Sequence, residues 1–144
     1  MASGLYGITF LNALNNSLAV DLDDTTADRF KVMLVTSAYT PDFGTHDFKA
    51  DVTNEVSGTG YTAGGESLTS VTLTQSAGTI TWDAADVTWA SSTITARGAV
   101  IYDDSLTSDP LICYIDFGSD QSSSSGDFVL SFNASGIFTL DLTP

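Results

Sequence analysis

The sequence contains very few basic residues. Its 144 residues include four Lys and Arg against 18 Asp and Glu, which gives a formal net charge of -14 at pH 7. Proteins bind DNA, RNA and anionic membranes largely through Lys and Arg, because these side chains displace counterions from phosphate groups. We therefore expect no nucleic acid and no membrane as partner, and we expect any partner to be neutral or basic.

Cysteine and histidine each occur only once. Cys113 cannot form an intrachain disulfide, and its place in an apolar run predicts a small buried hydrophobic side chain. His46 follows Gly44 and Thr45 with no nucleophile elbow nearby, so the residues of a Ser-His-Asp site are not recognisable. One His and one Cys cannot supply a structural zinc site. The sequence predicts no catalytic residues, no cofactor and no metal site, and a protein that is not an enzyme.

Calcium is the one ion that the acidic residues bring into question. Asp21, Asp23 and Asp24 lie within four residues of one another, and Asp103 and Asp104 are adjacent, so both places concentrate hard oxygen ligands. The spacing nevertheless departs from an EF-hand loop, which requires Glu where this sequence has Val32. A solvated acidic turn is favoured, and a loose calcium site is the alternative.

Long apolar runs are also missing. No stretch of about 18 apolar residues is present, which predicts no transmembrane helix. The first four residues carry no basic group and lead into no long apolar run, so we expect no secretory signal. The hydrophobic residues, 42% of the chain, are instead distributed over short segments.

These short segments have the pattern of β-strands. The apolar run at 29–36 predicts a strand in the interior of a sheet, and after Gly65 apolar residues alternate with Thr and Ser. Residues 94–102 and 111–117 are longer β-branched and aromatic runs. Residues 133–136 have turn composition between two alternating sets and predict a hairpin.

Many short strands with turns between them predict an all-β fold. We expect a single-domain antiparallel β-sandwich, jelly-roll-like, over residues 29–144. Residues 1–28 are expected to form an N-terminal arm or short helix plus an acidic turn, since Leu11, Leu14 and Leu18 recur at helical spacing.

Candidate interface residues come from this N-terminal segment and from the irregular region 38–65, because long irregular loops commonly form binding surfaces. Trp82 and Trp89 are in phase with apolar strand neighbours, which favours core packing over a sugar-binding platform. The predicted interface residues are Leu11, Leu14, Leu18, Tyr39, Phe43, Phe48 and Tyr61.

Several blocks of the sequence, in order, resemble a family of small tailed-bacteriophage virion proteins. The likeness covers most of the chain from residue 29 to residue 128. The blocks are FKVMLVTSAYTPD (30–42) followed by THDF (45–48), NEVSGTGYTAGG (54–65), DVTW (86–89) with STITAR (92–97), and PLI (110–112) with YIDFG (114–118).

Members of that family with an assigned role resemble capsid cement, or decoration, proteins, which are small β-rich subunits on the outside of the assembled shell. The resemblance implies a location on the outer capsid surface of the virion, the major capsid protein as partner, and a homotrimer. It carries over no catalytic residues. The alternative is a tail or baseplate accessory binding module, possibly carbohydrate-binding, with Trp82, Trp89, Tyr39 and Tyr61 as aromatic contacts.

Overall fold

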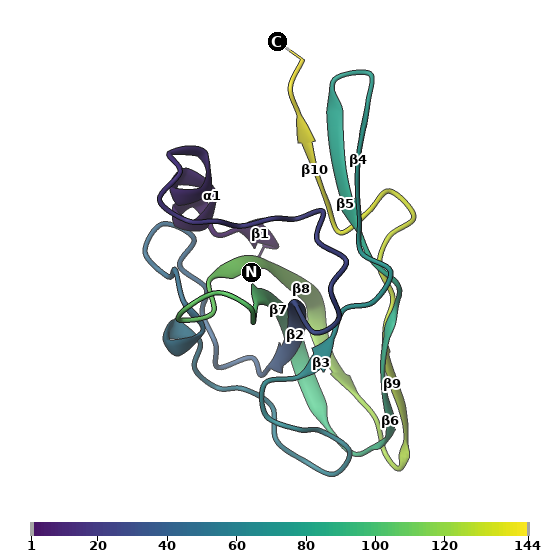
Figure 1. Ribbon diagram of the computed structural model, residues 1–144. Coiled ribbons are helices and arrows are strands. Elements are labelled where there is room, and N and C mark those ends of the chain that lie inside the picture. Colours follow the sequence, from purple (N-terminus) through teal and green to yellow (C-terminus); the bar gives the residue numbers. More distant parts are fainter. Residues whose placement is uncertain (1, 144) are drawn as a thin grey trace.

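The computed structural model describes residues 2–143, and over this range the chain forms ten strands, one α-helix and one 3-10 helix (Figure 1). Residues 1 and 144, the outermost residues of the two expected segments, lie outside the described residues. The elements are β1 (Gly4–Leu5), α1 (Gly7–Leu14), β2 (Phe30–Val35), η1 (Lys49–Asp51), β3 (Glu66–Ser67), β4 (Thr72–Ser76), β5 (Thr79–Asp83), β6 (Val87–Ser92), β7 (Thr95–Asp103), β8 (Leu111–Ser122), β9 (Gly126–Leu130) and β10 (Phe138–Asp141).

The strands form three antiparallel sheets, and the all-β prediction is confirmed. The main sheet has the strand order β1-β8-β7-β2-β3, a second has the order β10-β5-β4, and β6 pairs with β9. The finer expectation of a jelly roll is not confirmed by this division into five, three and two strands. No helix among residues 2–143 has the length and apolar character needed to cross a membrane.

The main sheet is buried on both faces, and β2 shows why. Phe30, Val32 and Leu34 belong to one hydrophobic cluster, whereas Met33 and Val35 belong to another on the opposite face. A strand buried on both faces needs apolar side chains at nearly every position. The run at 29–36, which is apolar at every position from Val32 to Val35, therefore encodes an interior strand, and the structure places β2 between β7 and β3.

The larger cluster fills the sandwich interior between the main sheet and the two smaller sheets. Trp82 of β5, Trp89 of β6 and Phe128 of β9 pack into it together with Ile101 and Ile112 of the main sheet. Both tryptophans are fully buried, so core packing is confirmed for them. Cys113 is buried as predicted, and burial raises the pKa of its thiol to about 12.

The other face of the main sheet is covered by irregular chain rather than by a second sheet. Tyr39 packs there against Tyr114, and the side chains of Phe43 and Val52 complete the cover. The Tyr6 and Tyr39 hydroxyls lie 2.8 Å apart in a buried hydrogen bond. Part of the longest irregular region of the sequence is thus a packing layer, held to the N-terminal segment.

The predicted hairpin at 133–136 is wrong. A turn does form there, with the Gly136 N–H donating to the Asn133 carbonyl at 2.8 Å, but the flanking strands belong to different sheets. Strand β9 pairs with β6, whereas β10 pairs with β5 and places Phe138 opposite Trp82. Alternation identifies a strand without identifying its partner, and here the turn carries the chain from one sheet to another.

Candidate binding groove

An apolar groove lies between α1 and the sheet of β4, β5 and β10. This sheet extends away from the main sheet (Figure 1), and we call it the arm; it is distinct from the N-terminal arm expected from the sequence. The volume of the groove is about 220 Å³. Thr9 is the only residue with a polar side chain in the lining. The lining residues are Thr9, Phe10, Ala13, Leu14, Val20, Leu22, Leu73, Ile80, Ile112, Phe138 and Leu140.

Helix α1 supplies one wall because its apolar residues exceed what its contact with the core can bury. Phe10 packs against the core and makes an edge-to-face contact with Phe138 of the arm, at a centroid distance of 5.8 Å. Leu14, at the end of the helix, lines the groove but is 88% exposed, and Leu11 is 58% exposed on the same helix. Leu14 continues the apolar lining of the groove, and contiguous exposed apolar surface marks interaction sites.

The arm supplies the opposite wall through the alternation of its strands. Leu73, Ile80 and Leu140 lie on the face of the arm that lines the groove, and Leu140 is paired with Ile80 across β10 and β5. Leu142, just beyond β10, is 63% exposed. The helix and the arm thus present apolar side chains that the protein itself leaves partly uncovered.

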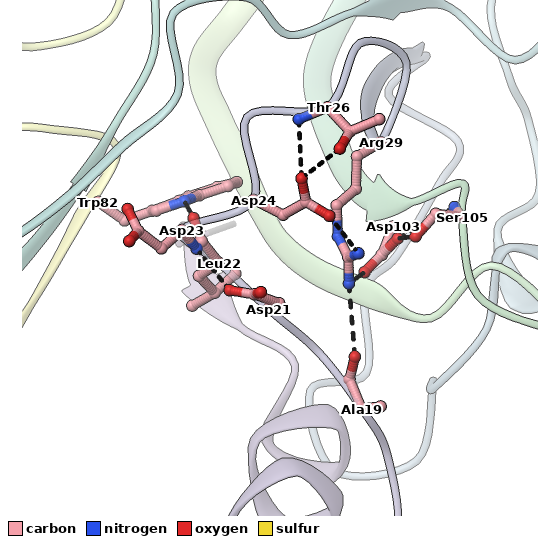
Figure 2. Close-up of polar contacts among 10 residues, drawn as sticks. All are labelled: Ala19, Asp21, Leu22, Asp23, Asp24, Thr26, Arg29, Trp82, Asp103 and Ser105. Carbon is pink, nitrogen blue, oxygen red and sulfur yellow. Dashed lines mark hydrogen bonds and ion pairs between the residues drawn. The ribbon is translucent and has the colours of Figure 1, made fainter.

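The segment that joins α1 to β2 contributes Val20 and Leu22, and two anchors fix it (Figure 2). The indole Nε1–H of Trp82 donates to the Leu22 carbonyl at 2.9 Å. The Arg29 guanidinium donates to the Ala19 carbonyl at 3.4 Å and to the Asp24 carboxylate at 2.8 Å. The segment is therefore tied to the arm at one point and to the body of the protein at another.

Arg29 also binds Asp103 at the end of β7, with 3.0 Å between Nη2 and Oδ2. Asp103 has an exposed fraction of 0% and accepts two further hydrogen bonds from Ser105, one from the backbone and one from the hydroxyl. Hydrogen bonds from Thr26, together with Arg29, hold the pKa of Asp24 below its usual value. Arg29 thus forms a buried ion-pair network that links the segment before β2, through Asp24, to the end of β7, through Asp103.

The same contacts bear on the calcium alternative. Asp24 and Asp103 are directed to Arg29, and Asp104 pairs with Lys31 at 2.8 Å. Within the described part of the chain, residues 2–143, no three His, Cys, Asp or Glu side chains are grouped so that they could hold a metal ion. The positive charge beside Asp24 and Asp103 is thus the guanidinium of Arg29.

Every Lys and Arg of the chain has a carboxylate partner. The pairs are Arg29 with Asp24 and Asp103, Lys31 with Asp104, Lys49 with Asp109, and Arg97 with Asp116. The remaining Asp and Glu side chains have no Lys or Arg left to pair with, since the sequence contains only four. Two of these carboxylates, Asp21 and Asp23, are exposed on either side of Leu22, which lines the groove.

Among the predicted interface residues, the N-terminal leucines and the aromatic residues have different environments. Leu11 and Leu14 are exposed, and Leu18 is half-buried. Their role at an interface stays a prediction. The structure adds Ile80 and Leu140, which are among the alternating apolar positions after Gly65. The alternation of Phe138, Leu140 and Leu142 was the sequence signal for this apolar face, and Leu142 at its end is 63% exposed.

The aromatic candidates have structural roles within the chain. Tyr39 is 1% exposed, so it has no surface to offer a partner, and its interface assignment is corrected to a core position. Tyr61 is half-buried and accepts the Leu34 N–H at 3.0 Å while it donates to Glu55 at 2.8 Å. Phe43 and Phe48 are also half-buried, and Phe43 packs against the ring of Tyr6.

The single histidine packs beside Tyr39. Its Nδ1 lies 3.1 Å from the Tyr39 hydroxyl oxygen and 3.4 Å from the backbone nitrogen of Asp42, which donates to it. The two rings are stacked at a centroid distance of 5.9 Å. These contacts tie His46 to the layer that covers the main sheet.

Comparison of the chain with protein-family models, with curated proteins and with solved structures returns no match. What the geometry itself offers is an apolar groove with fixed walls on a strongly anionic protein. Such a surface suits the binding of another macromolecule.

Proposed function

We propose that this chain is a phage structural protein that binds the outside of the assembled capsid and stabilises it, as a cement or decoration protein. The observation that carries the proposal is the groove between α1 and the arm, with Leu14 88% exposed at its wall. The sequence blocks between residues 29 and 128 that resemble small virion proteins support it independently.

The charge of the protein fits this role physically. A subunit that coats the outside of a DNA-filled shell should have no affinity for DNA, and a net charge of -14 opposes such binding. A cement protein stabilises a shell only if it binds the assembled lattice more tightly than it binds free capsid subunits. Apolar contacts that are completed only on the assembled surface provide such a difference in affinity. The proposed role requires no catalytic residues.

The carbohydrate-binding alternative lacks its predicted aromatic surface. Trp82, Trp89 and Tyr39 are buried, and Tyr61 is half-buried against Trp89. A sugar platform needs aromatic rings that face solvent. We therefore keep the capsid as the proposed partner and treat a location on the tail as an outcome that the virion experiment can return.

We also propose that the protein forms a homotrimer. Each copy carries a charge of -14, so association must overcome electrostatic repulsion between copies, and added salt screens that repulsion. Light scattering is expected to return three times the mass of 15.1 kDa, with the trimer favoured at higher salt and higher protein concentration. A mass of one chain at every concentration and salt level would contradict the proposal.

The virion experiment tests the function directly. Particles assembled without this protein are expected to rupture at lower temperature than complete particles, and adding the purified protein back should restore the heat resistance. A point variant is a better probe of the interface than deletion of the N-terminal segment, because deletion would also remove Tyr6 from the core. Leu14→Asp is expected to reduce attachment to the shell.

Val129→Asp is the matched control for that variant. Val129 is 52% exposed on β9 and is not among the lining residues of the groove, so the substitution adds the same charge elsewhere. It should restore heat resistance as the natural sequence does. Particles that survive heating equally well without the protein, or a protein found only on the tail, would end the capsid proposal.

A further inference from the structure

We infer that the groove between α1 and the arm binds a polypeptide segment in which apolar side chains are flanked by Lys or Arg. The identity of the molecule that presents this segment, a capsid subunit, rests on the proposed function. The chemistry of the segment rests on the groove and on the distribution of charge.

The size and lining of the groove favour protruding side chains over a small-molecule ligand. Its volume of about 220 Å³ lies below the roughly 300–1,000 Å³ that is typical of small-molecule sites. Apart from Thr9, the lining offers no polar side chain that could orient a small polar ligand. Large apolar side chains of a partner segment can occupy this space and cover the exposed Leu14.

The charges next to the groove select a basic segment. Val20 and Leu22 line the groove, and Asp21 and Asp23, which flank Leu22 in the sequence, are exposed. The four basic side chains of the chain are engaged with other carboxylates, so none is left to neutralise these two. Lys or Arg on either side of an apolar anchor would therefore meet uncompensated negative charge.

The same charges argue against a second copy of this chain as the occupant. Docking another copy here would bring an acidic chain against the exposed Asp21 and Asp23, two carboxylates that a trimer contact elsewhere on the surface avoids. Like charges that face each other across an interface cost free energy and suppress the wrong partner. Self-association should therefore use a different surface and should strengthen with salt, whereas binding at the groove should weaken with salt.

The test uses the full chain and three short synthetic peptides, with binding followed by fluorescence anisotropy. One peptide alternates Leu with Lys, the second alternates Leu with Glu, and the third alternates Ser with Lys. We expect the Leu/Lys peptide to bind and the other two to bind at least about 10-fold more weakly, because each of these lacks one of the two required features. Raising the salt concentration from about 50 to about 300 mM should weaken binding of the Leu/Lys peptide.

Two pairs of variants locate the binding site. Leu14→Asp should weaken binding of the Leu/Lys peptide by at least about 10-fold, because it removes an apolar contact and places a charge at the wall of the groove. Val129→Asp makes the same change of charge elsewhere and should leave affinity unchanged. Asp23→Asn should weaken binding by roughly 2- to 5-fold, as expected for loss of one exposed ion pair, and Asp120→Asn, which is also exposed, should not.

The results that would overturn the inference are specific. If the Leu/Glu peptide bound equally well, basic residues would not be required. If the Ser/Lys peptide bound equally well, apolar side chains would not be required, and the groove would not be the binding site. Equal losses in the Leu14→Asp and Val129→Asp variants would place binding elsewhere. Disruption of the oligomer by Leu14→Asp, with no peptide bound to the natural sequence, would identify a second copy as the occupant.

These outcomes can be told apart from failure of the proposed function. If the Leu/Lys peptide binds as expected while particles without the protein remain equally heat-resistant, the inference about the groove stands and the capsid role fails. If the protein restores heat resistance but neither the peptides nor Leu14→Asp shows an effect, the capsid role stands and the contact lies on another surface.

Discussion

Replacing Arg29 by Met is expected to lower the free energy of unfolding by about 3 kcal/mol, the lower end of the loss seen when one partner of a buried ion pair is removed. Arg29 has an 11% exposed side chain, and Asp103 has none of its surface exposed. The substitution leaves the Asp103 carboxylate with only its Ser105 hydrogen bonds in a buried position. Urea unfolding of the two proteins measures the difference.

Lys31→Met provides the matched control. Lys31 also pairs with an aspartate, Asp104, but both side chains are more than a quarter exposed, so the expected loss is about 0–1 kcal/mol. Adding Asp103→Asn to Arg29→Met should recover part of the lost stability, because the uncompensated charge is removed. If Arg29→Met and Lys31→Met lowered the free energy of unfolding equally, the buried ion pair of Arg29 with Asp103 would be no stronger than a surface ion pair.

Gly65→Ala is expected to destabilise the protein by roughly 3 kcal/mol, from two causes that act together. The φ of Gly65 is +78°, where a residue with a Cβ loses about 1–2 kcal/mol. In addition, an added Cβ would lie 1.8 Å from the carbonyl oxygen of Val32, so β3 could no longer approach β2 closely. Thermal unfolding followed by circular dichroism measures the effect.

Gly118→Ala separates the two causes. Gly118 has nearly the same φ, +79°, but an added Cβ there has no atom within 4 Å. We expect only the conformational loss of about 1–2 kcal/mol at this position. If both variants lost the same stability, the contact with the Val32 carbonyl would carry no weight, and the backbone angle alone would explain the need for glycine.

Individual strands could be predicted where the local sequence alone decides how a segment is buried. The run at 29–36 predicted an interior strand because a strand covered on both faces needs apolar side chains at nearly every position, and β2 is such a strand, with Lys31 as its one polar residue. The pairing of strands could not be predicted, because apolar and polar residues alternate in the same way in two strands of one hairpin and in two strands that belong to different sheets. The turn at 133–136 shows this, since β9 and β10 lie in different sheets.

The candidate site was only partly visible in the sequence. Leu11 and Leu14 at helical spacing indicated an apolar surface, and both are exposed. The opposite wall comes from the arm, which begins at Thr72, 58 positions after α1 ends at Leu14, and its distance to α1 depends on tertiary packing. Arg29 shows the same limit, because the partner that buries its charge is Asp103, 74 residues away.

The pairing of β1 with β8 has a consequence for the order in which the protein is built. Gly4 lies opposite Tyr114, and the Ser3 hydroxyl accepts the Asp116 N–H across 113 residues of sequence. During synthesis, β1 therefore has no partner until Tyr114, 110 residues after Gly4, has left the ribosome. Contacts between such distant residues form slowly, since the intervening chain must be closed into a loop first. The wall formed by α1 follows β1 directly, so the newly made chain should acquire its binding surface last, after the strands of the C-terminal half are in place.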